Sequence, residues 1–172
     1  MSREKRLQQV IDNFGKYVIQ QSRSNLTKNK KNASSSLYNS LAFKGKARGE
    51  NFEGSFFMED YALFVDQGVK GKNSSAKAPN SPFRFGTGTG RPGGLSESIP
   101  KWVRAKRFQF RDKKSGKFMS YEQTGFLIAR SIYQKGIKPS YFFSKPFGLA
   151  LAKLPLEIAQ AMLPKQEDFN KK

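Results

Sequence analysis

Few side chains in this sequence could carry out catalysis. The chain contains neither histidine nor cysteine, which excludes the commonest general base, thiolate nucleophiles and cysteine zinc sites. A metal-dependent nuclease would need two or three carboxylates that converge on Mg²⁺. The carboxylates close enough in sequence to cluster are Glu53, Glu59, Asp60 and Asp66. Their spacing matches no nuclease pattern, and helix caps or surface ion pairs explain them more simply. We expect no catalytic residue, cofactor or metal, and a nuclease is the third-ranked alternative.

A glycine-rich stretch is the second place where chemistry could occur. Residues 88–93 read GTGRPG and match the GxGxxG pattern of dinucleotide-binding loops. That pattern needs a buried strand before it and a helix that opens within it. Here a polar segment precedes it, and Pro92 removes one backbone donor. We interpret it as part of a long irregular loop from Val69 to Leu95.

Positive charge is the strongest compositional signal. The 172 residues include 32 Lys and Arg against 13 Asp and Glu, a net charge of +19. Such a charge costs self-repulsion, so it indicates either nucleic acid or acidic protein neighbours as partners. The two readings weigh about evenly, because basic residues are spread along the whole chain. The candidate contacts are Lys28, Lys30, Lys31, Arg107, Arg111, Lys113 and Lys114.

Basic and aromatic residues are interleaved in Phe108–Met119, which we predict to be a hairpin with strands Phe108–Arg111 and Lys117–Met119. Basic groups beside aromatic rings can bind a single nucleic-acid strand by charge and stacking. The alternation of Phe108 and Phe110 with polar residues favours an amphipathic hairpin instead, with the rings facing the core. We therefore expect buried rings in this segment.

Apolar periodicity predicts the elements of the N-terminal half. A helix is expected from Arg3 to about Leu26, with Ser2 as its cap, because apolar residues recur there at helical spacing. Its apolar positions are Leu7, Val10, Ile11, Phe14 and Val18, with Tyr17 beside them. Leu37–Arg48 is expected to begin as a short turn or helix and to become a strand. That strand should form a hairpin with Asn51–Met58.

Four further helices are predicted towards the C-terminus, over Glu59–Gln67, Ser96–Arg107, Tyr121–Lys135 and Phe147–Leu163. Gly68 should end the first helix, and Ser96 or Ser98 should cap the second. Ser120 should cap the third, and Pro155 should kink or restart the last. The side chains expected to face inward are Tyr61, Phe64, Val65, Trp102, Val103, Phe126, Leu127, Ala129, Ile132 and Tyr133.

Together these elements predict an α+β fold, with a small antiparallel sheet packed with three to four helices, a long N-terminal helix and an extended Gly/Pro-rich loop. Residues 1–30 form an amphipathic helix and basic arm, 37–163 a single domain, and 164–172 a polar tail. No apolar run approaches the roughly 20 residues of a membrane span, and no apolar stretch follows the charged start as in a signal peptide. We expect a soluble protein made in the cytosol.

Three segments occur in a recognisable order: Tyr61–Lys72 (YALFVDQGVKGK), Ile99–Arg107 (IPKWVRAKR) and Gly125–Phe143 (GFLIARSIYQKGIKPSYFF). In each, a Gly or Pro interrupts or ends an apolar patch. Their order over about Leu37–Leu154 resembles the tail-completion, or neck, proteins of tailed bacteriophages. Asp66 and Gly68 stand at the acidic and glycine positions of that family's YA-x-x-V-E/D-x-G pattern. The N-terminal region and the segment Phe108–Met119 are less typical of the family.

The resemblance implies a structural subunit that forms an oligomeric ring in the virion, in the neck between capsid portal and tail. Its partners would be copies of itself, portal, adaptor and tail proteins, and genomic DNA in the channel, with assembly in the host bacterial cytoplasm. Aromatic residues in loops are suitable interface anchors. The candidate interface residues are Phe83, Phe85, Arg91, Tyr141, Phe142 and Phe143. The alternative function is a basic nucleic-acid-binding accessory protein.

Overall fold

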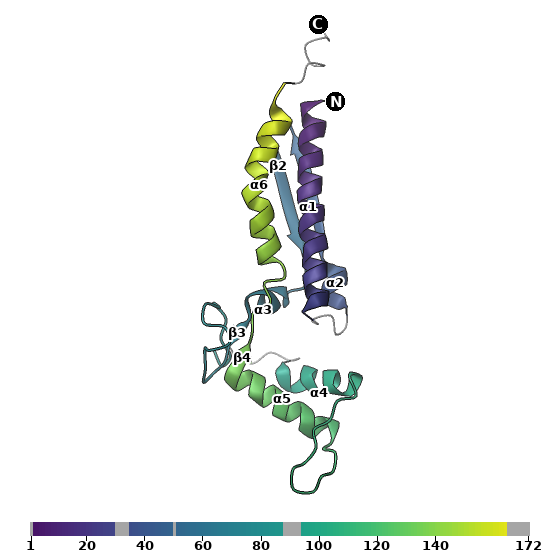
Figure 1. The fold of residues 1–172 in the computed structure, drawn as a ribbon, viewed down its shortest axis with the longest axis vertical. Coiled ribbons are helices and arrows are strands. Elements are labelled where there is room, and N and C mark those ends of the chain that lie inside the picture. The colour runs from purple at the N-terminus through teal and green to yellow at the C-terminus, as the bar shows by residue number, and fades with distance from the viewer. Residues whose placement is uncertain (1, 30–34, 50, 88–93, 165–172) are drawn as a thin grey trace. The chain divides into compact units, whose positions relative to one another are not determined.

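A computed structural model of the chain describes residues 2–29, 35–49, 51–87 and 94–164 (Figure 1). Over these residues the fold is α+β, with a long N-terminal helix and two small antiparallel two-stranded sheets. The predicted fold class is confirmed. The chain divides into two compact units, Met1–Ala62 with Tyr141–Lys172 (unit 1) and Leu63–Ser140 (unit 2). The predicted domain limits stay a prediction.

Unit 1 contains the elements α1 (Arg3–Lys28), α2 (Ser36–Ser40), β1 (Ala42–Arg48), β2 (Asn51–Phe57) and α6 (Ser144–Met162). The N-terminal helix is confirmed with its cap, because the Ser2 hydroxyl accepts a hydrogen bond from the Lys5 N–H at 3.3 Å. The hairpin is also confirmed. Arg48 pairs with Asn51, and Ala42 pairs with Phe57 at its far end.

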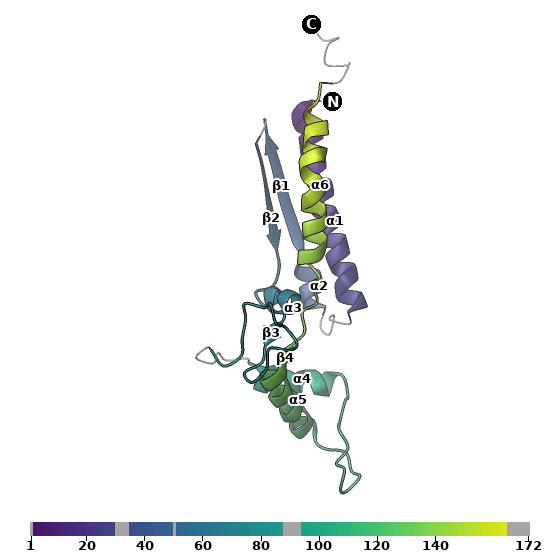
Figure 2. The same cartoon turned by 60° about the vertical axis from the view of Figure 1, so that its left-hand side comes forward.

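The core of unit 1 lies between two helices and the hairpin. In Figure 2, α1 and α6 lie side by side on one face of β1 and β2. Phe14 of α1 sits at the centre, and its ring meets the rings of Phe43, Phe56 and Phe147 edge-on, at centroid distances of 6.2, 5.9 and 6.0 Å. The helix stripe predicted from sequence therefore packs within its own unit, with Leu7, Ile11, Phe14 and Val18 buried.

A buried arginine joins the start of α1 to the end of α6. Arg6 of α1 is 8% exposed, and its guanidinium donates to the carbonyl oxygens of Ala161 at 2.9 Å and Leu163 at 3.1 Å. These carbonyls belong to the C-terminal turn of α6, where helix carbonyls lack intrahelical partners and a cation is favourable.

Two helical glycines of unit 1 make a matched pair for a stability test. A Cβ at Gly15 in α1 would lie 1.9 Å from the Phe43 ring, whereas a Cβ at Gly148 in α6 meets nothing within 4 Å. Gly15→Ala is expected to lower the free energy of unfolding by about 1–3 kcal/mol through overpacking. Gly148→Ala is expected to raise it by about 0.5–1 kcal/mol, because alanine favours a helix over glycine. Thermal melts of both variants measure these changes. Melting temperatures that shift in the same direction would contradict the packing described.

Helix α6 differs from its predicted bounds. It begins at Ser144, three residues before the predicted Phe147, and it continues through Pro155 without restarting. The earlier start follows from the pair Phe143 and Phe147. The Phe147 N–H donates to the Phe143 carbonyl at 3.0 Å, and the two rings stack at 5.5 Å.

Unit 2 contains most of α3 (Ala62–Gln67), and all of β3 (Val69–Lys70), α4 (Leu95–Ala105), α5 (Tyr121–Lys135) and β4 (Gly136–Ile137). The predicted bounds and cap of α5 are confirmed: Ser120 and Gln123 form a capping box. The cap predicted for α4 is wrong, because Gly94 occupies that position instead of Ser96 or Ser98.

The inward faces predicted for α3 and α4 are partly wrong. Tyr61, just before α3, and Phe64 within it are 41% and 43% exposed, and Ala62 and Asp66 are buried instead. These two residues are four apart and so share one face of a short helix, which turns the rings outward. In α4, Val103 is buried as predicted, but Trp102 is 40% exposed.

Candidate interaction surfaces

The three segments that carry the family resemblance lie mostly in unit 2 and meet there. The first and the third meet in a short antiparallel sheet, where β3 residues Val69 and Lys70 pair with Ile137 and Gly136 of β4. This contact requires glycine, because a Cβ at Gly71 would lie 2.1 Å from the Gln134 carbonyl oxygen. Gly136 has a φ of +83°, in the left-handed region that glycine adopts readily.

The second segment meets the third through a close helix contact. A Cβ at Gly125 in α5 would lie 2.7 Å from the Cα of Pro100 in α4. The buried side of α5 therefore carries small residues, Thr124, Gly125 and Ala129. The predicted apolar face was wrong for Phe126, Leu127 and Tyr133, which are exposed, whereas Ala129 is buried as predicted. The spacing of Gly125 and Ala129 was the sequence signal for this face.

The predicted anchors Phe83 and Phe85 lie in the loop beside β3. The Lys70 N–H donates to the Phe83 carbonyl at 2.8 Å, and the Phe85 N–H donates to the Lys70 carbonyl at 2.9 Å. The Phe83 ring meets Phe64 edge-on at 4.6 Å, and the Phe85 ring lies 5.9 Å from Tyr133. Both anchors are half-buried within unit 2, so each offers a partner only part of its ring.

The predicted anchors at 141–143 belong to unit 1. Tyr141 is 47% exposed, as an interface residue requires. Phe142 is fully buried, so the prediction that it is an exposed anchor was wrong; its carbonyl accepts a bond from Asn25 at 3.2 Å. Phe143 packs against Phe56 at 5.2 Å in the core of unit 1. The structure does not bring these residues together with Phe83 and Phe85 in one unit. Arg91 lies outside the described residues.

An exposed apolar stripe on α6 was not anticipated from the sequence. Its members recur at spacings of three and four residues, which places them on one side of the helix: Leu149, Ala152, Leu156, Ala159 and Leu163, the last just beyond the helix end. The three leucines are 55%, 65% and 61% exposed. The opposite side of α6 holds the buried residues Ala150, Leu154 and Ala161. We call these five exposed residues the α6 stripe.

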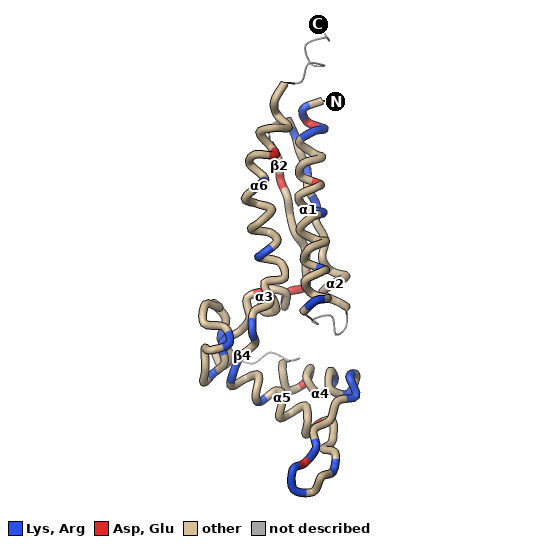
Figure 3. Tube along the Cα trace, in the orientation of Figure 1, with Lys and Arg blue, Asp and Glu red and all other residues tan. Residues whose placement is uncertain are grey.

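The basic candidates lie mainly on one loop of unit 2. The segment between α4 and α5 carries four exposed candidates: Arg107, Arg111, Lys113 and Lys114. Figure 3 shows the Lys and Arg positions along this segment in blue. Lys28 is exposed in the last turn of α1. Lys30 and Lys31 lie outside the described residues.

The expectation of buried rings in this segment was wrong. Phe108, Phe110 and Phe118 are 44%, 37% and 62% exposed. The predicted hairpin strands reduce to a single antiparallel bridge between Arg111 and Phe118. Two such short arms cannot cover their own rings, and no further layer of described residues closes over them.

The carboxylates considered for a nuclease have separate local roles and do not form a metal site among the described residues. Glu59 accepts a hydrogen bond from the Ser36 hydroxyl at 2.8 Å, and Asp66 is buried in α3. Among the described residues, no group of three or more acidic, His or Cys side chains could hold a metal ion. Likewise, no helix in the described ranges has both the length and the apolar character needed to cross a membrane.

No protein-family model, no curated protein and no solved structure matches this chain. A function for the chain must therefore be inferred from its own residues and contacts, and the resemblance to neck proteins rests on the three ordered segments.

Proposed function

We propose that this chain is a structural subunit that assembles with copies of itself into a ring in the neck of a tailed-bacteriophage particle, between portal or adaptor and tail. The observation that carries the proposal is the α6 stripe. Soluble proteins rarely leave contiguous apolar surface of this kind exposed unless a partner covers it.

We assign the partner of the α6 stripe to an adjacent copy of this chain, which contacts the stripe through a different face. The helix around the stripe is nearly neutral, with Lys153 and Glu157 beside it, in a chain of net charge +19. Copies can therefore approach each other here with less repulsion than at the basic surfaces. A contact between two different faces of neighbouring copies closes into a ring when its rotation allows, as a neck subunit requires.

The small size of the α6 stripe predicts that two copies alone associate only weakly. The three leucines are already partly buried in the subunit, so burying the rest of their surface stabilises a contact by about 3–5 kcal/mol. Loss of translational and rotational freedom costs about 4–15 kcal/mol. A single pair of copies should therefore be weak, and assembly should need high concentration, ring closure or a portal platform.

The second support is the packing of the three resemblance segments. They are separated in sequence, yet the greater part of each lies in unit 2, where they meet through contacts that need Gly71, Gly125 and Gly136. A resemblance based on the order of motifs is more specific when the motifs also contact each other in the fold, as these segments do.

A thiol footprint tests the proposed contact. The chain has no cysteine, so a single Ala152→Cys substitution places one thiol in the α6 stripe. We expect this thiol to react with a maleimide at least about tenfold more slowly in assembled particles than in the monomer, because burial in an interface excludes the reagent. The control thiol, Lys16→Cys on the exposed side of α1, should react alike in both. Equal reactivity of Ala152→Cys in both states would contradict the assigned contact.

A further inference from the structure

The segment between α4 and α5 concentrates positive charge. Over residues 106–119 it carries Lys106, Arg107, Arg111, Lys113, Lys114 and Lys117, and all six are exposed. Asp112 is the only carboxylate in this stretch of sequence. We call residues 106–119 the basic–aromatic loop.

We propose that the basic–aromatic loop binds single-stranded nucleic acid, with its cations on the phosphates and its phenylalanine rings stacked on bases. This inference goes beyond the proposed neck ring and does not depend on it. DNA and RNA share the chemistry of phosphate and base, so the experiment includes both.

The one carboxylate of the loop is used within the loop. Asp112 Oδ1 accepts hydrogen bonds from the Lys114 N–H at 3.0 Å, the Ser115 N–H at 2.7 Å and the Ser115 hydroxyl at 2.9 Å. The Ser115 backbone bond is the main cause that lowers the pKa of Asp112. A lowered folded pKa means that the stability these bonds contribute is present at neutral pH and is lost only as the pH falls through the folded pKa. Asp112 thus shapes the turn and forms no ion pair with a loop lysine.

The rings of the loop are presented to solvent between the cations. Phe118 is 62% exposed, and the Arg111 guanidinium lies 4.7 Å from its ring centroid. Phe108 and Phe110 form an edge-to-face pair at 5.2 Å and are also exposed. A guanidinium beside an exposed ring offers a phosphate contact and a stacking surface within the reach of one nucleotide.

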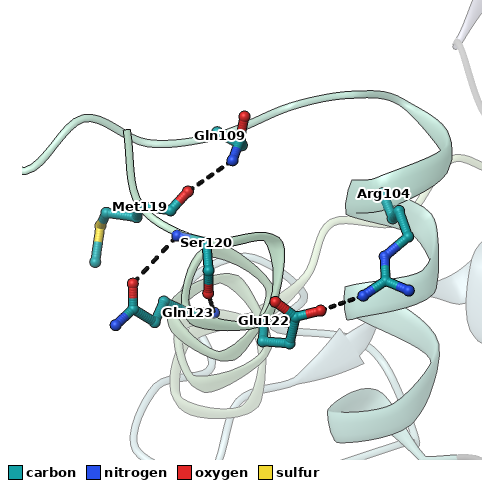
Figure 4. Close-up of polar contacts among 6 residues, drawn as sticks. All are labelled: Arg104, Gln109, Met119, Ser120, Glu122 and Gln123. Carbon is teal, nitrogen blue, oxygen red and sulfur yellow. Dashed lines mark hydrogen bonds and ion pairs between the residues drawn. The ribbon is translucent and has the colours of Figure 1, made fainter. Parts of the chain in front are cut away.

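The loop is held at both ends, so binding need not order it. The Gln109 side chain donates to the Met119 carbonyl at 2.8 Å, and Arg104 of α4 forms an ion pair with Glu122 of α5 (Figure 4). The Glu122 backbone N–H and then the Arg104 side chain lower the pKa of Glu122. A preorganised loop loses less conformational entropy on binding.

Arg107 occupies a position where glycine is usual. Its φ of +51° is left-handed, and it follows α4 in a Schellman arrangement, because the Phe108 N–H donates to the Val103 carbonyl at 3.1 Å. A non-glycine residue with this φ is strained. Arg107 therefore keeps a cation at the start of the loop at a conformational cost that glycine would avoid.

Single-stranded nucleic acid fits these features better than an acidic protein. Acidic side chains would pair with the cations but would leave three exposed rings without a stacking partner. A closed duplex would also leave them unstacked, because its bases are already stacked on each other. We therefore expect a single strand to bind more tightly than a duplex of the same length.

The experiment is fluorescence anisotropy with the full chain and labelled oligodeoxythymidylate, oligouridylate and a duplex of equal length, over a series of salt concentrations. Removing three cations through Arg111→Gln, Lys113→Gln and Lys114→Gln should reduce the slope of log affinity against log salt by about two. Phe118→Leu should weaken binding about tenfold with no change in slope, because it removes a stacking ring and no charge. The matched control, Lys5→Gln with Lys16→Gln and Lys46→Gln, removes the same charge from exposed positions of unit 1.

The proposal holds if the loop variants lose affinity and the control keeps it, for DNA, RNA or both. It is overturned if the wild-type chain does not bind, or if the control loses as much affinity as the loop triple variant, which would indicate general charge attraction. It is also overturned if Phe118→Leu binds normally and polyglutamate competes as well as the oligonucleotide, which would indicate an acidic protein partner. All these variants retain the α6 stripe, so particle mass reports separately on the ring.

Discussion

Gly136→Ala is expected to lower the free energy of unfolding by about 3 kcal/mol or more. Two costs combine at this residue. Its φ of +83° with a ψ of −179° is a conformation essentially confined to glycine, and alanine held there costs about 1–3 kcal/mol. In addition, the new Cβ would lie 2.3 Å from the Val69 carbonyl oxygen and 2.6 Å from the Gly71 nitrogen. Both are backbone atoms, so relief requires β3 and β4 to separate, which adds about 1–3 kcal/mol.

Gly116→Ala is the matched control for this prediction. Gly116 has a similar φ of +68°, but a Cβ there meets nothing within 4 Å. It should therefore show only the conformational cost of about 1–2 kcal/mol. Urea unfolding of both variants measures the difference between them. Equal losses would mean that the close approach of β3 and β4 does not exist as described.

Leu156→Glu is expected to weaken self-assembly by about thirtyfold or more. Leu156 is 65% exposed, at the middle of the α6 stripe. A charge placed in an interface core loses its hydration, and hot-spot residues contribute about 2 kcal/mol or more. The fold should be largely unaffected, because most of the side chain is exposed, and the melting temperature should be close to that of the wild type.

Two controls separate assembly from folding in this experiment. Gln9→Glu adds the same charge at an exposed position of α1 and should assemble normally. Leu154→Ala, on the buried side of α6, should instead destabilise the monomer by about 2–5 kcal/mol. Sedimentation across a concentration series measures the assembly constants. Unchanged assembly of Leu156→Glu would remove the α6 stripe as the contact.

Local signals predicted the parts of the fold that depend on local structure. The helix from Arg3, the strand pair and the helix Tyr121–Lys135 follow from caps, periodicity and turn residues, and the structure contains all of them. The inward faces of α3, α4 and α5 were less predictable. They depend on how closely neighbouring elements approach, as at Gly125 against Pro100, and a single sequence does not contain that distance.

The same limit applies to the candidate surfaces. Helix α6 is apolar on most of its circumference, so periodicity alone does not tell which side packs inward, and the stripe became visible only when Leu154 was found buried and Leu156 exposed. Conversely, aromatic type alone suggested that Phe142 was an anchor, although it belongs to the core. The basic residues of the 106–119 loop were found from sequence because charge density needs no tertiary information.

Ring assembly is tested most directly by the mass and shape of the purified wild-type protein, measured by light scattering and negative-stain imaging, alone and with isolated virion necks. A neck subunit should form closed rings at high concentration, or decorate the portal end of the necks. A chain that remains monomeric at every concentration and ignores the necks would contradict the proposed function.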